Sequence, residues 1–353
     1  MPVRILLLAD THLGFDLPLR PRVRRRRRGP DFLASYHRAL EPALAGAVDL
    51  VVHAGDVFHR ARVPPTLVVQ AFEPLRRLAD GGTQVFVVPG NHERSRIPHA
   101  RFALHPGIHV FDRPRTFRVA VAGLRVALLG FPFERRDVRV RFPALVEATG
   151  WRAWRDDLAL LCVHHCFEGA RVGPQNYTFR NTPDVIRGRD VPGGVAAVLT
   201  GHVHRHQLLT RDLAGRALPA PILYPGSTDR TAFAEMGEAK GTVLLEVDED
   251  RDRAGGCLVR WRFHELPTRP MAVADVEADG MSEAALSGQV AAALERAPAE
   301  AVLRLRVHGR VRDDARGALS AARLRALAPE GMNVDVVFVD EPRRPRRAVV
   351  TGI

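Results

Sequence analysis

The chain has 353 residues, of which 46% are hydrophobic, so it can form one large domain with a smaller second one, and wholesale disorder is excluded. Lys and Arg total 52 against 40 Asp and Glu, and the formal net charge of +12 favours polyanionic partners, nucleic acid above all. No apolar run reaches the roughly 18 residues of a transmembrane helix, and three cysteines are too few for a disulfide framework, so a cytoplasmic protein without a membrane partner is predicted.

Short apolar segments recur along the first part of the chain, and each is followed directly by polar residues. Continuous runs of leucine and β-branched residues of this length predict strands that are buried on both faces of a sheet. Two helical stretches, Phe32–Ala47 and Thr66–Ala79, lie between such segments, so the pattern indicates an α/β fold. The predicted strands are Ile5–Ala9, Leu50–Ala54, Val85–Val88, Leu158–Val163 and Val195–Leu199.

From about Leu218 the pattern changes to successive strands, and Leu266–Pro270 then predicts a linker to a smaller α/β unit. In that unit Ser282 is placed to cap a helix whose apolar residues recur at every fourth position. A second helix is predicted over Ala315–Leu327. The predicted strands of this part are Ile222–Tyr224, Thr242–Val247, Leu258–Phe263, Ala272–Val276, Leu303–Val307 and Val334–Val339.

The polar residues that follow the predicted strands include several that bind metal ions. Because ligands bind at the carboxyl ends of strands in such sheets, we expect these side chains to converge at one edge. Carboxylate, amide and imidazole donors favour divalent ions such as Mn²⁺, Fe²⁺ or Zn²⁺ over a thiolate site. The set is larger than one ion uses, so two ions are predicted, with Asp56 as the candidate bridge. The expected ligands are Asp10, His12, Asp56, Asn91, His164, His202 and His204.

These residues stand in five blocks that resemble the motifs of the calcineurin-like metallophosphoesterase superfamily. The blocks are Asp10-Thr11-His12, Gly55-Asp56, Gly90-Asn91-His92-Glu93, His164 and Gly201-His202-Val203-His204. The resemblance implies a β-sandwich flanked by helices, in α/β/β/α layers, and two-metal hydrolysis of a phosphoester. It also implies that His92 is not a ligand but donates a hydrogen bond or a proton beside the phosphate, with Glu93 or another acid orienting its ring.

Longer segments are similar to the SbcD-type branch, the bacterial and archaeal nucleases of DNA double-strand-break repair. They are Asp10–Gly14, Gly55–His59, Tyr224–Glu235 and Lys240–Glu246. This resemblance implies manganese-dependent exonuclease or endonuclease action on DNA at the nucleoid, an SMC-like ATPase partner of the SbcC type, and a phosphate-facing role for His59. Formation of a homodimer is left as an alternative to a monomer. The expected domains are a nuclease domain at residues 1–266, a capping domain at 267–341 and a basic tail at 342–353.

Several features of the sequence allow a second interpretation. The run Arg20–Arg28 is expected to contact DNA phosphate, with a solvated loop as the alternative. Arg304 and Arg306 are weaker candidates for DNA contact, and His165 is the alternative to His164 as a ligand. The alternative functions are a phosphodiesterase or phosphatase for small phosphoesters and a non-catalytic scaffold, which the intact ligand blocks disfavour.

Overall fold

The computed structural model describes residues 1–16, 27–93, 104–250 and 252–339. These residues divide into two compact units: the larger one holds residues 1–16 and 28–268, and the smaller one holds Arg27 and the residues from Arg269 onward. The larger unit holds two six-stranded sheets and the smaller one a three-stranded sheet. The expected basic tail at 342–353 and residues 20–26 of the arginine run lie outside the described residues. No helix of the described part of the chain is both long and apolar enough to cross a bilayer.

The first sheet has the strand order β16-β15-β1-β2-β3-β4, in which β1 to β4 run parallel, β15 is antiparallel to β1 and β16 is antiparallel to β15. Helices α1 (Gly29–Leu44) and α2 (Pro65–Asp80) cover its outer face, where Tyr36 and Leu75 pack against Leu6. The strands are β1 (Val3–Leu8), β2 (Leu50–His53), β3 (Gln84–Val87), β4 (Ile108–Val110), β15 (Gly241–Asp248) and β16 (Cys257–Glu265).

The second sheet has the order β13-β14-β12-β7-β6-β5, with β6, β7, β12 and β14 parallel. Helix α4 (Val138–Glu147) covers its outer face through Phe142, which packs with Leu129 and Leu161. Two short pairs, β8 (Cys166–Phe167) with β11 (Val185–Ile186) and β9 (Arg171–Val172) with β10 (Tyr177–Thr178), lie in the connections. The strands are β5 (Arg115–Val121), β6 (Leu124–Gly130), β7 (Leu158–Val163), β12 (Ala197–Thr200), β13 (Gln207–Arg211) and β14 (Ala217–Tyr224).

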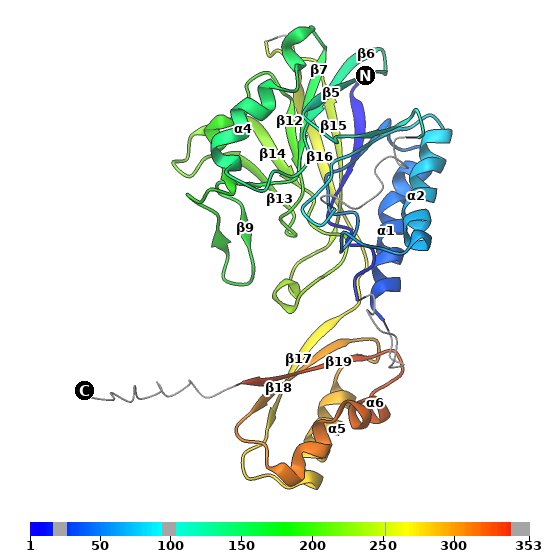
Figure 1. Ribbon diagram of the computed structural model, residues 1–353, viewed down its shortest axis with the longest axis vertical. Helices are drawn as coiled ribbons and strands as arrows, with labels where there is room; N and C mark the ends of the chain where they lie inside the picture. The colour runs from blue at the N-terminus through cyan, green and yellow to red at the C-terminus, as the bar shows by residue number, and fades with distance from the viewer. Residues whose placement is uncertain (17–26, 94–103, 251, 340–353) are drawn as a thin grey trace, which may run out of the picture. The chain divides into compact units, whose positions relative to one another are not determined.

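The two sheets pack face to face, and helices lie on the outer side of each (Figure 1). Leu7 and Phe86 of the first sheet share one buried cluster with Leu128 and Leu160 of the second. The central strands are therefore buried on both faces, which explains their uninterrupted apolar sequences. This arrangement is the expected α/β/β/α sandwich, so the predicted fold class is confirmed.

The smaller unit has three parallel strands in the order β17-β18-β19, with a helix α5 (Glu283–Arg296) that Ser282 caps by accepting a hydrogen bond from the Ala285 amide. The single helix expected over Ala315–Leu327 is wrong. A 3₁₀ segment, η4 (Asp313–Leu319), ends at Ser320, whose extended backbone and side chain start a separate helix α6 (Ala321–Leu327). That this unit is a capping domain stays a prediction. The strands are β17 (Met271–Glu277), β18 (Val302–His308) and β19 (Asn333–Val339).

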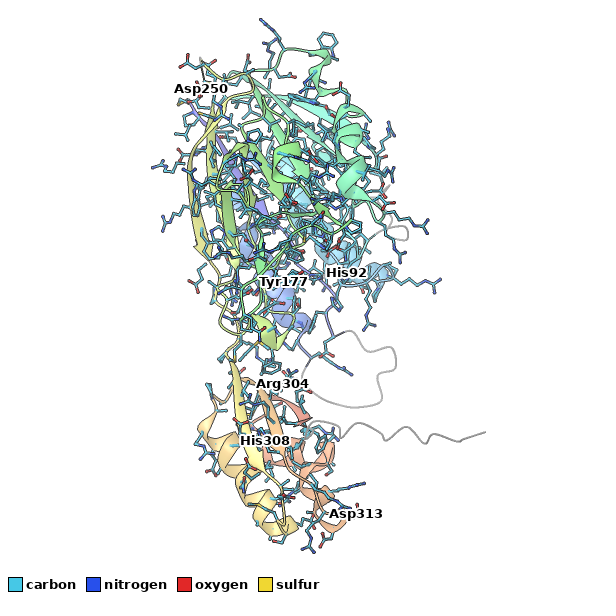
Figure 2. The ribbon with its side chains drawn as sticks, turned by 90° about the vertical axis from the view of Figure 1, so that its left-hand side faces the viewer. His92, Tyr177, Asp250, Arg304, His308 and Asp313 are labelled. Carbon is cyan, nitrogen blue, oxygen red and sulfur yellow. The ribbon has the colours of Figure 1, made fainter. Side chains whose placement is uncertain are left out.

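The face of this small sheet that points away from its helices carries alternating charges. Arg304 of β18 pairs with Asp335 at 2.7 Å, and Arg306 pairs with Asp275 at 2.7 Å. His308 contacts the same Asp275 at 2.6 Å; Figure 2 labels Arg304 and His308. Each arginine thus already has a carboxylate partner, which weakens both residues as candidates for DNA contact.

Candidate metal centre

The loops at the carboxyl ends of β1, β2 and β12 have an unusual backbone conformation. Asp10, His12, Asp56 and His202 have φ angles of 52°, 44°, 53° and 78°. A non-glycine residue in this left-handed region costs of order 1–3 kcal/mol and is found where surrounding contacts enforce it, often at functional sites. Those contacts include the Asp10 amide donating to the Gly55 carbonyl at 2.9 Å and the His12 amide donating to the Asp56 carbonyl at 3.0 Å.

Glycines in three of the sequence blocks allow these loops to approach one another. A Cβ on Gly90 would lie 2.1 Å from Asp56 Oδ1, and one on Gly55 would lie 2.2 Å from His164 Nδ1. A Cβ on Gly201 would lie 2.4 Å from the Ala54 carbonyl oxygen. All three separations are far shorter than a carbon contact allows, so these positions require glycine for packing.

One group of predicted ligands gathers around His164. Its Nδ1 donates to the Ala54 carbonyl at 2.7 Å, which points Nε2 at Asp56 Oδ2, 3.4 Å away, and at Asp10 Oδ1, 3.9 Å away. The side-chain oxygen of Asn91 lies 3.1 Å from His164 Nε2 and 2.9 Å from His202 Nδ1. Two carboxylates, an amide oxygen and two imidazoles therefore meet at this point.

A second group adjoins the first: it shares Asp10, and its His12 approaches Asp56. His12 Nε2 lies 3.0 Å from His204 Nε2 and 4.0 Å from Asp56 Oδ2. His204 Nε2 lies 3.8 Å from Asp10 Oδ1. The fold thus brings together all seven residues predicted from the sequence as ligands.

The residues present fit divalent metal ions. The potential ligand atoms of Asp10, His12 and His204 lie within 4.8 Å of one another, and so do those of Asp10, Asp56 and His164. Two nitrogen donors bound at right angles to one ion, through bonds of about 2.1 Å, lie about 3 Å apart. The His12–His204 separation has this value, and the donors are all nitrogen or oxygen, as Mn²⁺, Fe²⁺ and Zn²⁺ accept.

The electrostatics of the site also favour a cation. Burial raises the pKa of Asp10 to about 6, although the charges of the nearby His164 and His204 act to lower it. Burial acts in the same direction on Asp56, but the charges of His164, His12 and His92 outweigh it and lower the pKa of that carboxyl. Two carboxylates that are buried side by side repel each other, and a bound cation offsets that repulsion.

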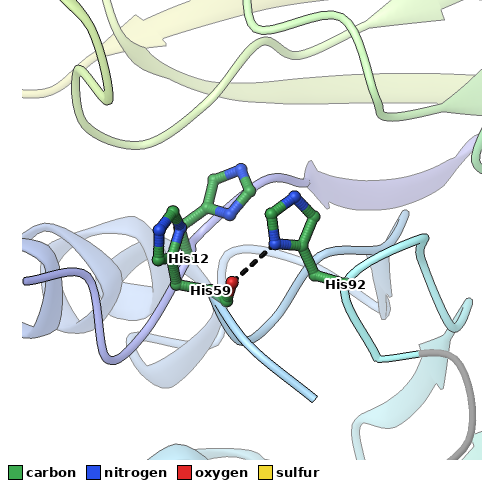
Figure 3. Close-up of side chains that lie close together, drawn as sticks. All are labelled: His12, His59 and His92. Atoms are coloured by element: carbon green, nitrogen blue, oxygen red, sulfur yellow. Dashed lines mark hydrogen bonds between the residues drawn. The ribbon is translucent and has the colours of Figure 1, made fainter. Parts of the chain in front are cut away.

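His59 and His92 border the same site (Figure 3). Their ring centres lie 5.4 and 4.9 Å from that of His12. The His92 ring is held by its Nδ1, which donates to the backbone carbonyl of His59 at 2.6 Å, and the His92 amide donates to Asp56 Oδ1 at 3.0 Å. Ligand atoms of His12, His59 and His92 also lie within 4.8 Å of one another, so this trio is a third potential ligand group.

Glu93 has a different role from the one expected of it. Its carboxylate accepts hydrogen bonds from the amides of Phe58 at 2.9 Å and Gly90 at 2.8 Å. Burial, reinforced by the charge of Asp56, raises the pKa of Glu93 to about 8. Glu93 therefore joins the loops after β2 and β3, and the His59 carbonyl orients the His92 ring in its place.

The two adjacent histidines after β7 point in different directions. His164 lies among the carboxylates, as described above. His165 Nε2 accepts a hydrogen bond from the Glu134 amide at 3.1 Å, and its ring stacks on Phe133 with centres 4.8 Å apart. The arrangement places His165 against the connection between β6 and α4, outside the ligand groups.

Arg28, the last residue of the arginine run, lies inside the fold. It is 7% exposed, donates from Nη2 to Asp229 Oδ1 at 3.1 Å, and lies over the rings of Phe15 and Phe32, 5.2 Å from each centre. The expectation that the whole run contacts DNA is therefore wrong for this residue. Phe15 also meets the His59 ring edge to face at 4.9 Å, so this buried contact supports the rim of the site.

Sequence reasoning assigned no role to His53, although it supports the first block. His53 Nε2 lies 3.0 Å from the Thr11 hydroxyl, which in turn donates to the Val57 carbonyl at 3.1 Å. Burial lowers the pKa of His53 to about 3, so the ring stays neutral. Its position as the last residue of β2, two residues before the second block, is the sequence signal that could have identified it.

Comparisons with known proteins agree with this geometry. The family model described as Calcineurin-like phosphoesterase matches residues 3–206. The chain is 31% identical over 281 residues to the DNA double-strand break repair protein Mre11 of Haloferax volcanii, covering 78% of this chain and 55% of that protein. It is 25% identical over 299 residues to the Mre11 protein of Methanopyrus kandleri, covering 80% and 61%.

A third relative is the D subunit of the nuclease SbcCD of Bacillus subtilis. The two sequences are 28% identical over 302 residues, which cover 74% of this chain and 72% of that protein. The chain spans less than two thirds of the length of the two Mre11 proteins. These matches confirm the resemblance to calcineurin-like metallophosphoesterases and to their SbcD-type branch.

Proposed function

Because the chain belongs to the calcineurin-like phosphoesterase family, we propose that it is a DNA repair nuclease that hydrolyses phosphodiester bonds with two divalent metal ions. The observation that carries the proposal is the pair of adjoining ligand groups that share Asp10, with Asp56 Oδ2 3.4 Å from His164 Nε2 in one group and 4.0 Å from His12 Nε2 in the other. The names of the relatives, two DNA double-strand break repair proteins and one part of a nuclease, support DNA as the substrate. The net charge of +12 suits a polyanion.

The proposed ligands divide between the two groups. His12 and His204 would hold one ion, Asn91, His164 and His202 would hold the other, and Asp10 and Asp56 would supply their carboxylates. Such ions lower the pKa of bound water to near neutrality and offset the charge on a phosphate. Mn²⁺ is the ion that we favour, with Fe²⁺ and Zn²⁺ as alternatives that accept the same donors.

His92 and His59 are the proposed contacts to the substrate. The hydrogen bond to the His59 carbonyl keeps a proton on His92 Nδ1 and turns Nε2 toward the site, 3.8 Å from Asp56 Oδ2. From there Nε2 reaches a phosphate or leaving oxygen next to the ligand groups. His59 Nδ1 is buried and has no hydrogen-bond partner within the described residues, so no internal hydrogen bond from that atom fixes the ring.

Partners and location follow from this activity. Because the Bacillus subtilis relative is named as one component of the nuclease SbcCD, we propose that this chain also acts with a second protein, an SMC-like ATPase of the SbcC type. A DNA repair nuclease acts on the chromosome, so the proposed location is the nucleoid in the cytoplasm. A homodimer is compatible with the same function.

The test is hydrolysis of linear double-stranded DNA by the purified full chain in Mn²⁺, beside hydrolysis of bis(p-nitrophenyl) phosphate. We expect both activities to need metal and to stop in excess chelator. If the protein binds two ions and cleaves the small diester but leaves the DNA uncut, it is an enzyme for small phosphoesters. Absence of both activities in the metal-loaded protein would indicate a scaffold.

A further inference from the structure

A buried ion cluster lies behind the ligand His204. Its centre is Lys240, which is the single lysine in a chain whose Lys and Arg total 52. Lys240 is 1% exposed, and its ammonium group has three polar neighbours: the His204 carbonyl at 2.9 Å, Glu235 Oε2 at 2.7 Å and Glu238 Oε2 at 3.2 Å. An ammonium group has three donors, so each one is used.

The Glu235 carboxylate connects this lysine to the metal ligand. Its Oε1 accepts from His204 Nδ1 at 3.1 Å and from the Thr231 hydroxyl at 2.5 Å. Its Oε2 accepts from Lys240 and, at 3.3 Å, from the Thr231 amide. The residue as a whole is 8% exposed, and both carboxylate oxygens are fully bonded, so the position of the carboxylate is fixed from four directions.

We propose that Glu235, held in place by Lys240, is a positioning residue that sets the tautomer and direction of His204 for one of the two metal ions. A carboxylate that accepts the Nδ1 proton leaves the Nε2 lone pair for the ion and increases its donor strength. In the structure His204 Nε2 points at His12 Nε2, 3.0 Å away, and toward Asp10. This inference rests on the proposed metal centre and adds a residue outside its ligand set.

The same lysine holds the loop of His204 from its other side. Glu238 Oε1 accepts from Arg205 Nε at 2.9 Å, and Arg205 continues to Asn176 Oδ1 at 2.6 Å and the Gly173 carbonyl at 2.8 Å. These last two residues form the turn between β9 and β10. Two carboxylates and two cations balance in charge, so the cluster needs no metal ion to neutralise it and can keep His204 oriented before an ion binds.

A lysine suits this place better than an arginine. The ammonium directs its donors in three directions at one point, whereas a guanidinium spreads its donors in a plane and needs more room. The next residue, Gly241, is also confined, since a Cβ there would lie 2.2 Å from the His264 carbonyl oxygen. We therefore expect that Lys240→Arg does not preserve the position of Glu235.

The experiment is calorimetric titration of the metal-free full chain with Mn²⁺, for the wild type and for Glu235→Ala and Glu235→Gln. Loss of an outer partner of a metal-bound histidine weakens metal binding by about 10–100-fold. In Glu235→Ala we expect the affinity for one of the two Mn²⁺ ions to fall by this factor and the affinity for the other to stay unchanged. Glu235→Gln keeps an acceptor oxygen for Nδ1, so its loss should be smaller.

Glu246→Ala is the matched control, because Glu246 lies on β15 and pairs with the exposed Arg260 at 2.6 Å, away from the ligands. It should bind both ions as the wild type does. Thermal unfolding without metal reports folding, and if Glu235→Ala does not fold, Glu235→Gln carries the test. Unchanged affinity for both ions, or equal weakening of both, overturns the inference. If the Glu235 variants bind one ion more weakly and the wild type does not cleave DNA, the inference is supported and only the proposed nuclease function is refuted.

Discussion

Replacing His59 with serine is the most direct test of how this site recognises its substrate. The substitution removes the imidazole but keeps the backbone carbonyl that orients His92 at 2.6 Å. His59 Nδ1 has no hydrogen-bond partner in the described part of the protein, so no internal hydrogen bond from that atom is lost. The change therefore isolates the contribution of one side chain at the rim.

The expected effect is a large loss of DNA cleavage with metal content intact. Burial, reinforced by the neighbouring His92, lowers the pKa of His59 to about 4, so at neutral pH the ring is uncharged and acts through a hydrogen bond. A positioned group of this kind contributes roughly two to four orders of magnitude in rate, equivalent to about 3–5 kcal/mol of transition-state stabilisation.

The assay compares the rate on linear DNA with that on bis(p-nitrophenyl) phosphate, whose leaving group needs little assistance. The DNA rate should fall and the small-diester rate should change much less, while DNA binding persists because it depends mainly on phosphate charge. His37→Ser, on the exposed side of α1, is the matched control and should behave as the wild type. A wild-type rate on DNA would remove His59 from the site, and loss of bound metal would make it a ligand with His12 and His92.

Four further predictions concern the ligands and the arginine run. Asp56→Asn should lose most bound Mn²⁺ after desalting, because Asp56 serves both ligand groups; full metal content in elemental analysis would contradict its shared role. Gly201→Ala should also lose metal although it is no ligand, since its Cβ would lie 2.4 Å from the Ala54 carbonyl oxygen; a normal metal content would show that the loop can shift. Arg28→Ala leaves Asp229 buried and should lower the free energy of unfolding in urea by about 3–5 kcal/mol, and a loss under about 1 kcal/mol would mean that Asp229 finds another partner. Replacing Arg24, Arg25 and Arg26 together by alanine should flatten the salt dependence of DNA binding by roughly one unit of log–log slope per lost phosphate contact, whereas an unchanged slope would assign the run to solvent.

Some elements were not predictable from sequence patterns. The hairpin of β5 and β6 has no clear sequence pattern, because its outer strand β5 is only half-buried and mixes charged with apolar residues. Helix α4 contains Pro143 and two arginines, so its apolar face is short. The break at Ser320 was hidden because helical spacing continues across it, while the cap that causes it is a local hydrogen bond.

The sequence by itself determined which residues belong to the candidate centre. Buried parallel strands have uninterrupted apolar sequences, and their polar carboxyl ends must meet at one edge, so Asp10, Asp56 and the histidines of the later blocks could be placed together from their positions in the chain. The glycines beside them follow from the same crowding, because strand ends that approach this closely leave no room for a Cβ.

The tertiary structure alone decided how these residues are supported. Whether Glu93 meets a ring or two amides, whether Arg28 faces solvent or Asp229, and which carboxylate holds His204 all depend on side-chain contacts between residues distant in the chain. No periodicity encodes such contacts, since each one depends on the path of the loops between strands. The physical reason is that backbone hydrogen bonding and burial repeat along a sequence, whereas the pairing of individual polar groups is settled only when the chain has packed.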